Sequence, residues 1–195
     1  MYAQMSLSEQ RRERLASWIV VGVFVLALLL GLAVKTAAEG RTVVHEAEGL
    51  RLRYPAGWVK VSTDAPVLLQ VEKLASPFRT ALTLQRRPIP PEAEKPLSAV
   101  QQALTLERAR AWTAYRVLSV DDSATVDKRP ALHVVFAYVE SNPNPFLQTA
   151  PVVMLGEDYL FAVGEQVQIV TVTAAEANYS RAQRDFQAFL RSAPK

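Results

Sequence analysis

The longest apolar run in the chain lies close to its amino terminus. Residues 15–34, LASWIVVGVFVLALLLGLAV, carry no charged side chain, and about 20 apolar residues in a helix cross a hydrocarbon layer of about 30 Å. The run therefore predicts a transmembrane helix over 15–34, with a tail over 1–14 before it and a linker over 35–41 after it. A cleaved signal peptide is the alternative, because residues 36–38 are small, but its apolar region usually has about 7–15 residues.

The charges that flank this span are uneven. Three arginines precede it, at Arg11, Arg12 and Arg14, whereas Lys35 is the first charge to follow. Positive residues favour the cytoplasmic side, so we expect a single-pass protein of the cell membrane with a cytoplasmic amino terminus. Residues 42–195 then form an extracytoplasmic domain, periplasmic or extracellular. Trp18 stands near the start of the span, where an indole suits the membrane interface.

Ala27 and Gly31 form a small-xxx-small pair within the span. Such a pair lets a second helix approach closely, which makes the two residues a candidate packing site for other membrane protein subunits. The alternative is a chance occurrence in a passive anchor.

After the linker, short runs of alternating apolar and polar positions predict β-strands. The runs fall in two groups, 43–47, 50–54, 59–62, 67–73 and 81–86, then 116–120, 131–141, 152–155, 159–163 and 167–173. Four prolines between 88 and 96 end the first group, and Gly156-Glu157-Asp158 predicts a hairpin turn within the second.

Two segments have apolar residues at helical spacing. A helix over 97–115 is predicted from a capping box at Ser98 and Gln101, and a second over 173–192 from one at Thr173 and Glu176. The second helix gathers Tyr179, Ala182, Phe186, Phe189 and Leu190 on one face. Strands that follow one another through short turns favour an antiparallel sheet covered by helices, so the domain is predicted to be α+β.

The stretch Tyr54-Pro55-x-Gly57-Trp58, which follows an extended run, resembles the amino-terminal signature of the PsbP-like family. The ending VQIVTVTA-AEANYSRAQRDFQAFLRS and the segment VDKRPALHVVFAYVES are similar to later strands and the last helix of that family. The resemblance covers 43–193 and implies a fold shared with a Ran-binding nuclear-transport factor. It also implies a binding or assembly role, because family members described as extrinsic or accessory subunits are mostly non-enzymatic. Independently of the family, Pro55 and Gly57 break the strand, and Trp58 is expected to turn into the core.

Composition narrows the candidate chemistry. The chain has no cysteine, which excludes disulfides and thiolate chemistry, and its only histidines are His45 and His133. From residue 42 onward, 17 Lys or Arg face 16 Asp or Glu, a net charge of +1, so the domain lacks the basic surface of a nucleic-acid-binding protein.

Neither histidine belongs to a recognisable catalytic set. His133 lies in an alternating strand pattern typical of a half-buried or exposed side chain, and no G-x-S-x-G motif occurs. The acids Asp121, Asp122 and Asp127 lack the order of a calcium loop and favour a solvated turn. We therefore expect a protein that is not an enzyme, with no catalytic residue, no cofactor and no metal ligand.

One loop is a candidate partner contact. Two Asn-Pro steps hold the backbone extended and project apolar residues; the loop comprises Asn142, Pro143, Asn144, Pro145, Phe146 and Leu147. The alternative is that Phe146 folds back onto its own core.

Together these features predict a membrane-anchored, non-catalytic accessory or assembly subunit of a larger membrane protein complex. The alternative is a membrane-tethered extracytoplasmic protein that binds a small ligand or a metal between sheet and helix.

Overall fold

The computed structural model describes residues 7–39, 42–47, 50–73, 78–141, 146 and 150–192. The chain divides into two compact units, Met1–Arg41 and Thr42–Lys195. The first contains helix α1, Leu7–Glu39. Its segment Ser17–Ala37 has the length and apolar composition to cross a membrane, and its side chains are exposed among the described residues.

The three flanking arginines lie in the amino-terminal part of α1, and the Trp18 side chain is 74% exposed. The helix continues beyond the predicted span, so residues 35–39, expected in the linker, are helical. Residues 35–39 contain no glycine or proline, and Lys, Ala and Glu favour helix.

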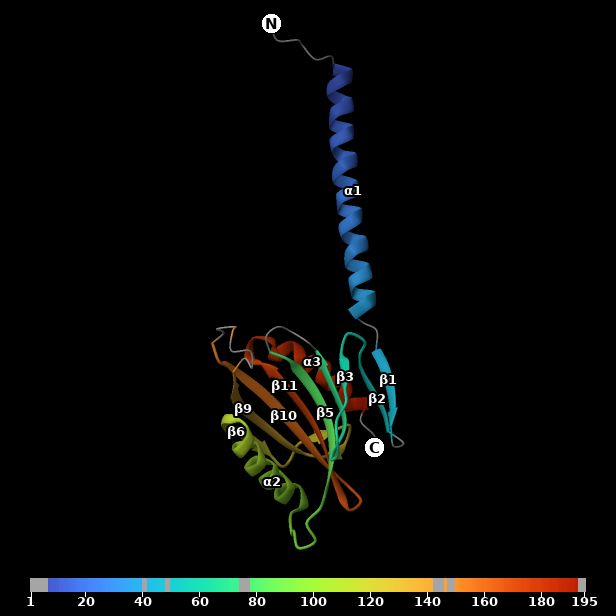
Figure 1. The fold of residues 1–195 in the computed structure, drawn as a ribbon. Coiled ribbons are helices and arrows are strands. Elements are labelled where there is room, and N and C mark those ends of the chain that lie inside the picture. Colours follow the sequence, from blue (N-terminus) through green and yellow to red (C-terminus); the bar gives the residue numbers. More distant parts are fainter. Residues whose placement is uncertain are drawn as a thin grey trace. The chain divides into compact units, whose positions relative to one another are not determined.

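The second unit is built on a seven-stranded sheet in which every neighbouring pair is antiparallel (Figure 1). The order across the sheet is β3-β4-β5-β11-β10-β9-β6. The strands are β3 (Val59–Val61), β4 (Val67–Lys73), β5 (Thr80–Pro88), β6 (Thr113–Asp121), β9 (Leu132–Glu140), β10 (Val152–Val163) and β11 (Gln166–Ala175). Strands β1 (Thr42–Ala47) and β2 (Leu50–Pro55) form a separate hairpin, as do β7 (Thr125–Val126) and β8 (Arg129–Pro130). With helices α2 (Pro96–Ala111) and α3 (Glu176–Ser192), this is the expected α+β fold.

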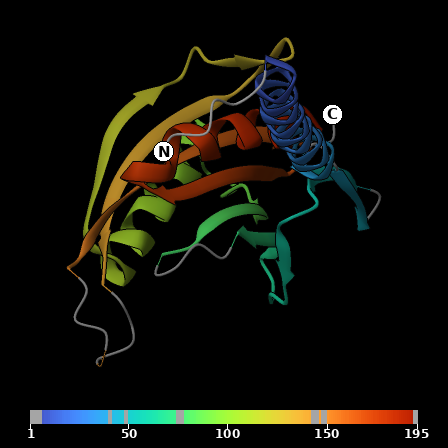
Figure 2. The ribbon, with the colours of Figure 1, turned by 90° about the horizontal axis from the view of Figure 1, so that it is seen from above.

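The two helices cover opposite faces of the sheet (Figure 2). Helix α3 packs on β10, β11, β5 and on β2, and its predicted apolar face is confirmed, since Ala182, Phe186, Phe189 and Leu190 are at most 3% exposed. On the other face, Val100 and Leu104 of α2 pack against apolar residues of β9, β10 and β11. Because successive strand residues point to opposite faces, each central strand supplies both layers.

The Tyr54–Trp58 stretch forms a turn that ends β2. The Trp58 amide donates a hydrogen bond of 3.0 Å to the Pro55 carbonyl, and the Trp58 and Tyr54 side chains are 6% and 7% exposed. Both belong to the core cluster beneath α3. Trp58 is therefore a core residue, as predicted.

The hairpin turn predicted at Gly156-Glu157-Asp158 is wrong, because β10 runs through these residues without a break. Gly156 lies against the Phe136 ring, where an added Cβ would stand 2.2 Å from Phe136 Cζ, so glycine here provides space and not a turn. The turn lies later, between β10 and β11, where Gly164 has a φ of +58°, a backbone region that favours glycine.

Both capping boxes are wrong as well. Helix α2 begins at Pro96 after Lys95, which makes no side-chain cap, and proline suits the first helical position because its missing N–H has no helical partner there. Thr173 belongs to β11, since strand pairing continues through Ala175.

The end of the predicted 97–115 helix is also too late. Helix α2 ends at Ala111, and Trp112 is extended. Its ring stacks on Tyr138 with centroids 4.3 Å apart, and Tyr115 lies in β6 against Phe136. Trp112 and Tyr115 are therefore apolar because they contact the sheet, and they do not belong to the apolar face of a helix.

Candidate functional site

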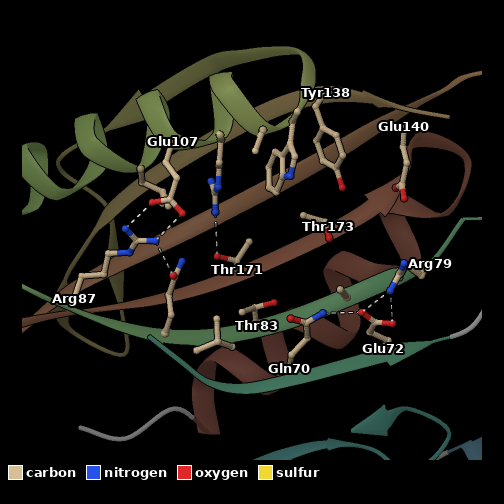
Figure 3. A pocket seen from close by; sticks show the side chains of 17 residues that line it. Gln70, Glu72, Arg79, Thr83, Arg87, Glu107, Tyr138, Glu140, Thr171 and Thr173 are labelled. Carbon is tan, nitrogen blue, oxygen red and sulfur yellow. Dashed lines mark hydrogen bonds and ion pairs between the residues drawn. The ribbon is translucent and has the colours of Figure 1, made fainter. Parts of the chain in front are cut away.

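A polar groove of about 340 Å³ lies between α2 and the sheet face opposite α3 (Figure 3). We call it the α2 groove. It is lined by Val67, Gln70, Glu72, Arg79, Ala81, Thr83, Gln85, Arg87, Leu104, Glu107, Arg108, Ala111, Trp112, Tyr138, Glu140, Thr171 and Thr173.

The groove exists because α2 covers only part of the sheet. The helix packs on β6, β10 and β11, so β4 and β5 extend beyond it. Alternation along β5 sends Thr83, Gln85 and Arg87 to the groove, while Leu82 and Leu84 enter the core beneath α3. The polar face of the amphipathic strand β5 thus forms part of the groove lining.

A buried ion pair joins α2 to the sheet beside the groove. Arg108 Nη1 donates to Asp158 Oδ2 at 2.5 Å and Arg108 Nη2 to Asp158 Oδ1 at 2.9 Å, and the Thr171 hydroxyl donates to Oδ1 at 2.6 Å. The side chains of Arg108 and Asp158 are 7% and 2% exposed. Burial disfavours the charged guanidinium, but the Asp158 carboxylate and, to a smaller extent, Tyr115 together outweigh burial and raise the pKa of Arg108. This pair holds α2 in place.

A second pair closes one end of the groove. Arg87 Nη1 and Nη2 donate to the two carboxylate oxygens of Glu107 at 2.7 and 3.1 Å. These hydrogen bonds lower the pKa of the Glu107 carboxyl. The Glu107 side chain is 56% exposed, so the pair stands at the mouth of the groove.

At the other end, Glu72 of β4 accepts hydrogen bonds from two neighbours. Gln70 Nε2 lies 2.6 Å from Glu72 Oε1, and Arg79 Nη1 lies 3.2 Å from Glu72 Oε2. The Glu72 side chain is 5% exposed and that of Arg79 56%. The carboxylate therefore belongs to the floor and the guanidinium to the rim.

Aromatic side chains and a carboxylate occupy the wall between α2 and β9. Tyr138 and Glu140 of β9 point into the groove toward Thr173 (Figure 3), and Trp112 stacks on Tyr138. Burial and the nearby Glu140 charge raise the pKa of Tyr138 to about 12, so its hydroxyl stays protonated at neutral pH. Among the described residues, Glu140 has no ion-pair partner.

The two histidines lie in different sheets. His45 lies in the β1–β2 hairpin, where its Nε2 is 3.1 Å from Lys60 Nζ. His133 lies on the α3 side of β9, stacked on Tyr159, with its side chain 23% exposed, as the strand pattern predicted.

A buried carboxylate lies beside His133. His133 Nε2 is 3.3 Å from Glu157 Oε2, within ion-pair distance but outside hydrogen-bond geometry. Glu157 Oε1 accepts hydrogen bonds from Tyr179 and Gln183 of α3. Burial disfavours the Glu157 carboxylate, yet His133 and these donors together lower its pKa. The cluster anchors α3 to β10.

The acidic turn is held by its own side chains. Asp121 Oδ1 accepts from the Ser123 amide and hydroxyl at 2.9 and 2.6 Å. Among the described residues, no group of three or more His, Cys, Asp or Glu is arranged to hold a metal ion.

Of the candidate partner loop, residues 142–145 and 147 lie outside the described residues. Phe146 is described, and its side chain is 91% exposed. In α1, Ala27 and Gly31 lie on one side of the helix and border a shallow groove with Phe24, Leu28, Leu32 and Lys35.

The residues of the α2 groove were not predicted from the sequence as a site. They come from β4, β5, β9, β11 and α2, and no local motif joins them. A usable signal was present in TLQRR, residues 83–87, where every second position is polar or charged within a strand otherwise expected to be buried.

The fold and this groove define an α+β domain with a polar concavity between one helix and an antiparallel sheet. No family model matches the chain, and no curated protein matches its sequence. Among solved structures the fold is similar to that of the cyanobacterial PsbP protein (CyanoP) from Synechocystis sp. PCC 6803, with a TM-score of 0.52 and 11% identity over 78% of this chain and 91% of that one.

It is also similar to the Ran-binding protein Mog1p of Saccharomyces cerevisiae, with a TM-score of 0.51 and 9% identity over 79% of this chain and 95% of that one. These structures confirm the resemblance at the level of the fold. At such identities the likeness concerns the fold alone.

Proposed function

We propose that the chain is a single-pass membrane protein whose extracytoplasmic PsbP-like domain serves as a non-catalytic accessory or assembly subunit of a larger membrane complex. One observation carries the proposal: a long apolar helix, unburied over Ser17–Ala37, is joined to a separate compact domain. An uncleaved anchor keeps such a domain at the membrane, where membrane partners are concentrated.

The histidine positions further support a non-catalytic role. His45 and His133 lie on strands of different sheets, and His133 takes part in a cluster that anchors α3. Nucleophilic catalysis of the serine-hydrolase kind needs a histidine held beside a nucleophile, and neither histidine has that setting among the described residues.

The first test is native purification through a carboxy-terminal tag in mild detergent, with co-purifying proteins identified by mass spectrometry. A stoichiometric set of membrane proteins supports the accessory-subunit proposal. A monomer that co-purifies with nothing contradicts it.

A matched pair of α1 variants tests whether the anchor itself makes the contact. A Cβ at Gly31 or at Gly22 meets nothing within 4 Å, so leucine at either position leaves the isolated helix intact. The two glycines lie about half a turn apart around α1. Gly31→Leu is expected to release the partners and Gly22→Leu to retain them; equal retention would mean that the span is a passive anchor.

Orientation can be tested directly because the chain has no cysteine. A Ser119→Cys variant places one thiol on an exposed strand of the domain, and a Ser8→Cys variant places one before the span. Membrane-impermeant maleimide is expected to label residue 119 in intact cells and residue 8 only after permeabilisation. The reverse pattern contradicts the proposed topology, and a chain shortened at its amino terminus identifies a signal peptide.

A second candidate function is tethered binding of a small ligand, favoured by the α2 groove. Its volume of about 340 Å³ falls within the range of about 300–1,000 Å³ usual for ligand sites. Ligand binding to the native state raises the melting temperature by mass action, so a thermal-shift screen of small molecules and metals tests this function.

A further inference from the structure

In the α2 groove the arginines are paired with carboxylates, while several other polar groups keep unused hydrogen-bonding capacity. Each of its three arginines has a carboxylate partner: Arg79 pairs with Glu72, Arg87 with Glu107, and Arg108 with Asp158. An anionic ligand would have to separate one of these pairs or leave its own charge without a partner. Since a separated charge at a buried position is costly, the groove disfavours an anionic ligand.

The groove groups with unused hydrogen-bonding capacity include both donors and acceptors. The Thr83 hydroxyl makes no hydrogen bond to another described residue, Gln85 keeps its amide N–H₂, and Gln70 keeps its amide oxygen after donating to Glu72. Glu140 adds a carboxylate acceptor at the β9 wall. A hydroxyl group can donate and accept at once. A ligand with several neighbouring hydroxyls can therefore form hydrogen bonds with both the donors and the acceptors of the lining.

The same wall offers apolar surface. Trp112 and Tyr138 are only partly buried. Their rings stack on each other, and both residues line the groove, where Tyr138 lies near Glu140 (Figure 3). Aromatic rings combine a large apolar face with a polar group at the edge. A ligand with C–H groups on one face and hydroxyls around its rim would meet the rings and the polar floor together.

We infer that the α2 groove binds a short uncharged saccharide. The ring carbons lie against the parts of Trp112 and Tyr138 that their mutual stacking leaves open to the groove, and the hydroxyls meet Thr83, Gln85 and Glu140. The open rim, where the Arg79 and Glu107 side chains are each 56% exposed, lets a sugar enter from solvent. This inference specifies the ligand class of the second candidate function and rests on it.

The test uses the full chain in lipid nanodiscs, because alkyl glycoside detergents would present sugars to the groove. The probes are maltose, cellobiose and diacetylchitobiose, supplemented by an array of immobilised neutral glycans. Zwitterionic glycine betaine, anionic glutamate and cationic spermidine serve as charged comparators. Binding is measured by thermal shift and by saturation-transfer NMR, in which aromatic protons of the protein transfer saturation to the ring protons of a bound sugar.

Two groove variants and one matched control locate the site. Thr83→Val and Tyr138→Phe each remove one hydroxyl from the groove, whereas Thr125→Val removes one from an exposed strand outside it. Loss of one hydrogen bond is expected to weaken sugar binding about 2-fold to 10-fold in the groove variants. The control is expected to bind as the wild type does.

The outcomes separate the inference from the function on which it rests. Binding of a neutral glycan that the groove variants weaken supports it. Tighter binding of a charged comparator, or glycan binding that the groove variants leave unchanged, overturns the saccharide assignment while ligand binding itself stands. No binding by any probe or glycan overturns the saccharide assignment, and the second candidate function is then decided by the wider thermal-shift screen of small molecules and metals.

Discussion

Removing one partner of the buried Arg108–Asp158 pair is expected to destabilise the domain far more than replacing both partners. In Arg108→Met, the Asp158 carboxylate, 2% exposed, loses two hydrogen bonds and keeps only the one from the Thr171 hydroxyl. Removing one partner of a buried ion pair costs about 3–5 kcal/mol. The guanidinium also lies 4.4 Å from the centre of the Phe136 ring, a cation–π contact worth about 0.5–2 kcal/mol that is contained within that cost.

Removing both charges should reverse most of this loss. In the double variant Arg108→Met with Asp158→Val neither charge of this pair remains, and replacing a buried pair by apolar residues of similar volume is often neutral or stabilising. The double variant is therefore expected to be more stable than either single variant. The three variants and the wild type form a double-mutant cycle.

The free energy of unfolding is measured by urea denaturation of residues 42–195, which form a compact unit separate from α1. Tryptophan fluorescence is a suitable signal because the centre of the Trp112 ring lies 5.1 Å from Arg108 Cζ. The reasoning is refuted if Arg108→Met costs less than about 1 kcal/mol, or if the two single losses simply add in the double variant.

Further predictions concern the two faces of β10 and the helix above it. Gly156→Ala is expected to destabilise the domain by about 1–3 kcal/mol, because the new Cβ collides with the Phe136 ring; Gly57→Ala, in open space, should change stability by less than about 0.5 kcal/mol in the same urea assay. The pKa of Glu157 is lowered by folding from a reference of 4.5, so its contribution is complete above about pH 4.5 and disappears as the pH falls through the folded value. Glu157→Gln should therefore cost about 1.5–3 kcal/mol at pH 7, with a difference from wild type that shrinks in unfolding curves recorded toward pH 3; a constant difference would contradict this. Phe186→Ala empties a fully buried position of α3 and should cost about 3–5 kcal/mol, while a loss below about 1 kcal/mol would mean that α3 is not held by its apolar face.

The sequence predicted those features of the fold that depend on local periodicity. The apolar face of α3 and the inward turn of Trp58 follow from spacing and from the Pro55–Gly57 break, and the structure confirms both. Element boundaries failed where tertiary contacts override local signals. Trp112 and Tyr115 have helical spacing but pack on β9.

Gly156-Glu157-Asp158 failed for a different reason. A glycine followed by two acids is typical of a turn, but each residue here is satisfied by a partner distant in sequence: Phe136 fills the space above the glycine, α3 donates to Glu157, and α2 donates to Asp158. The candidate site was beyond prediction for the same reason. Its walls come from separate elements, and Arg108, polar by type, is 6% exposed.

If α1 anchors the chain in a membrane, as we propose, the β1–β2 hairpin that follows it would determine how the chain responds to force. In the β1–β2 pair Thr42 lies opposite Pro55, so the chain arrives from α1 and leaves for the rest of the domain at the same end of the hairpin. Tension between membrane and domain would load this one residue pair and peel β1 away pair by pair, in the manner of a zipper. Strand β2 would stay in place, because Leu52 and Tyr54 are buried in the core.

Peeling β1 would release its six residues, about 20 Å of extended chain. Under load the β1–β2 hairpin would therefore lengthen before the seven-stranded sheet is strained.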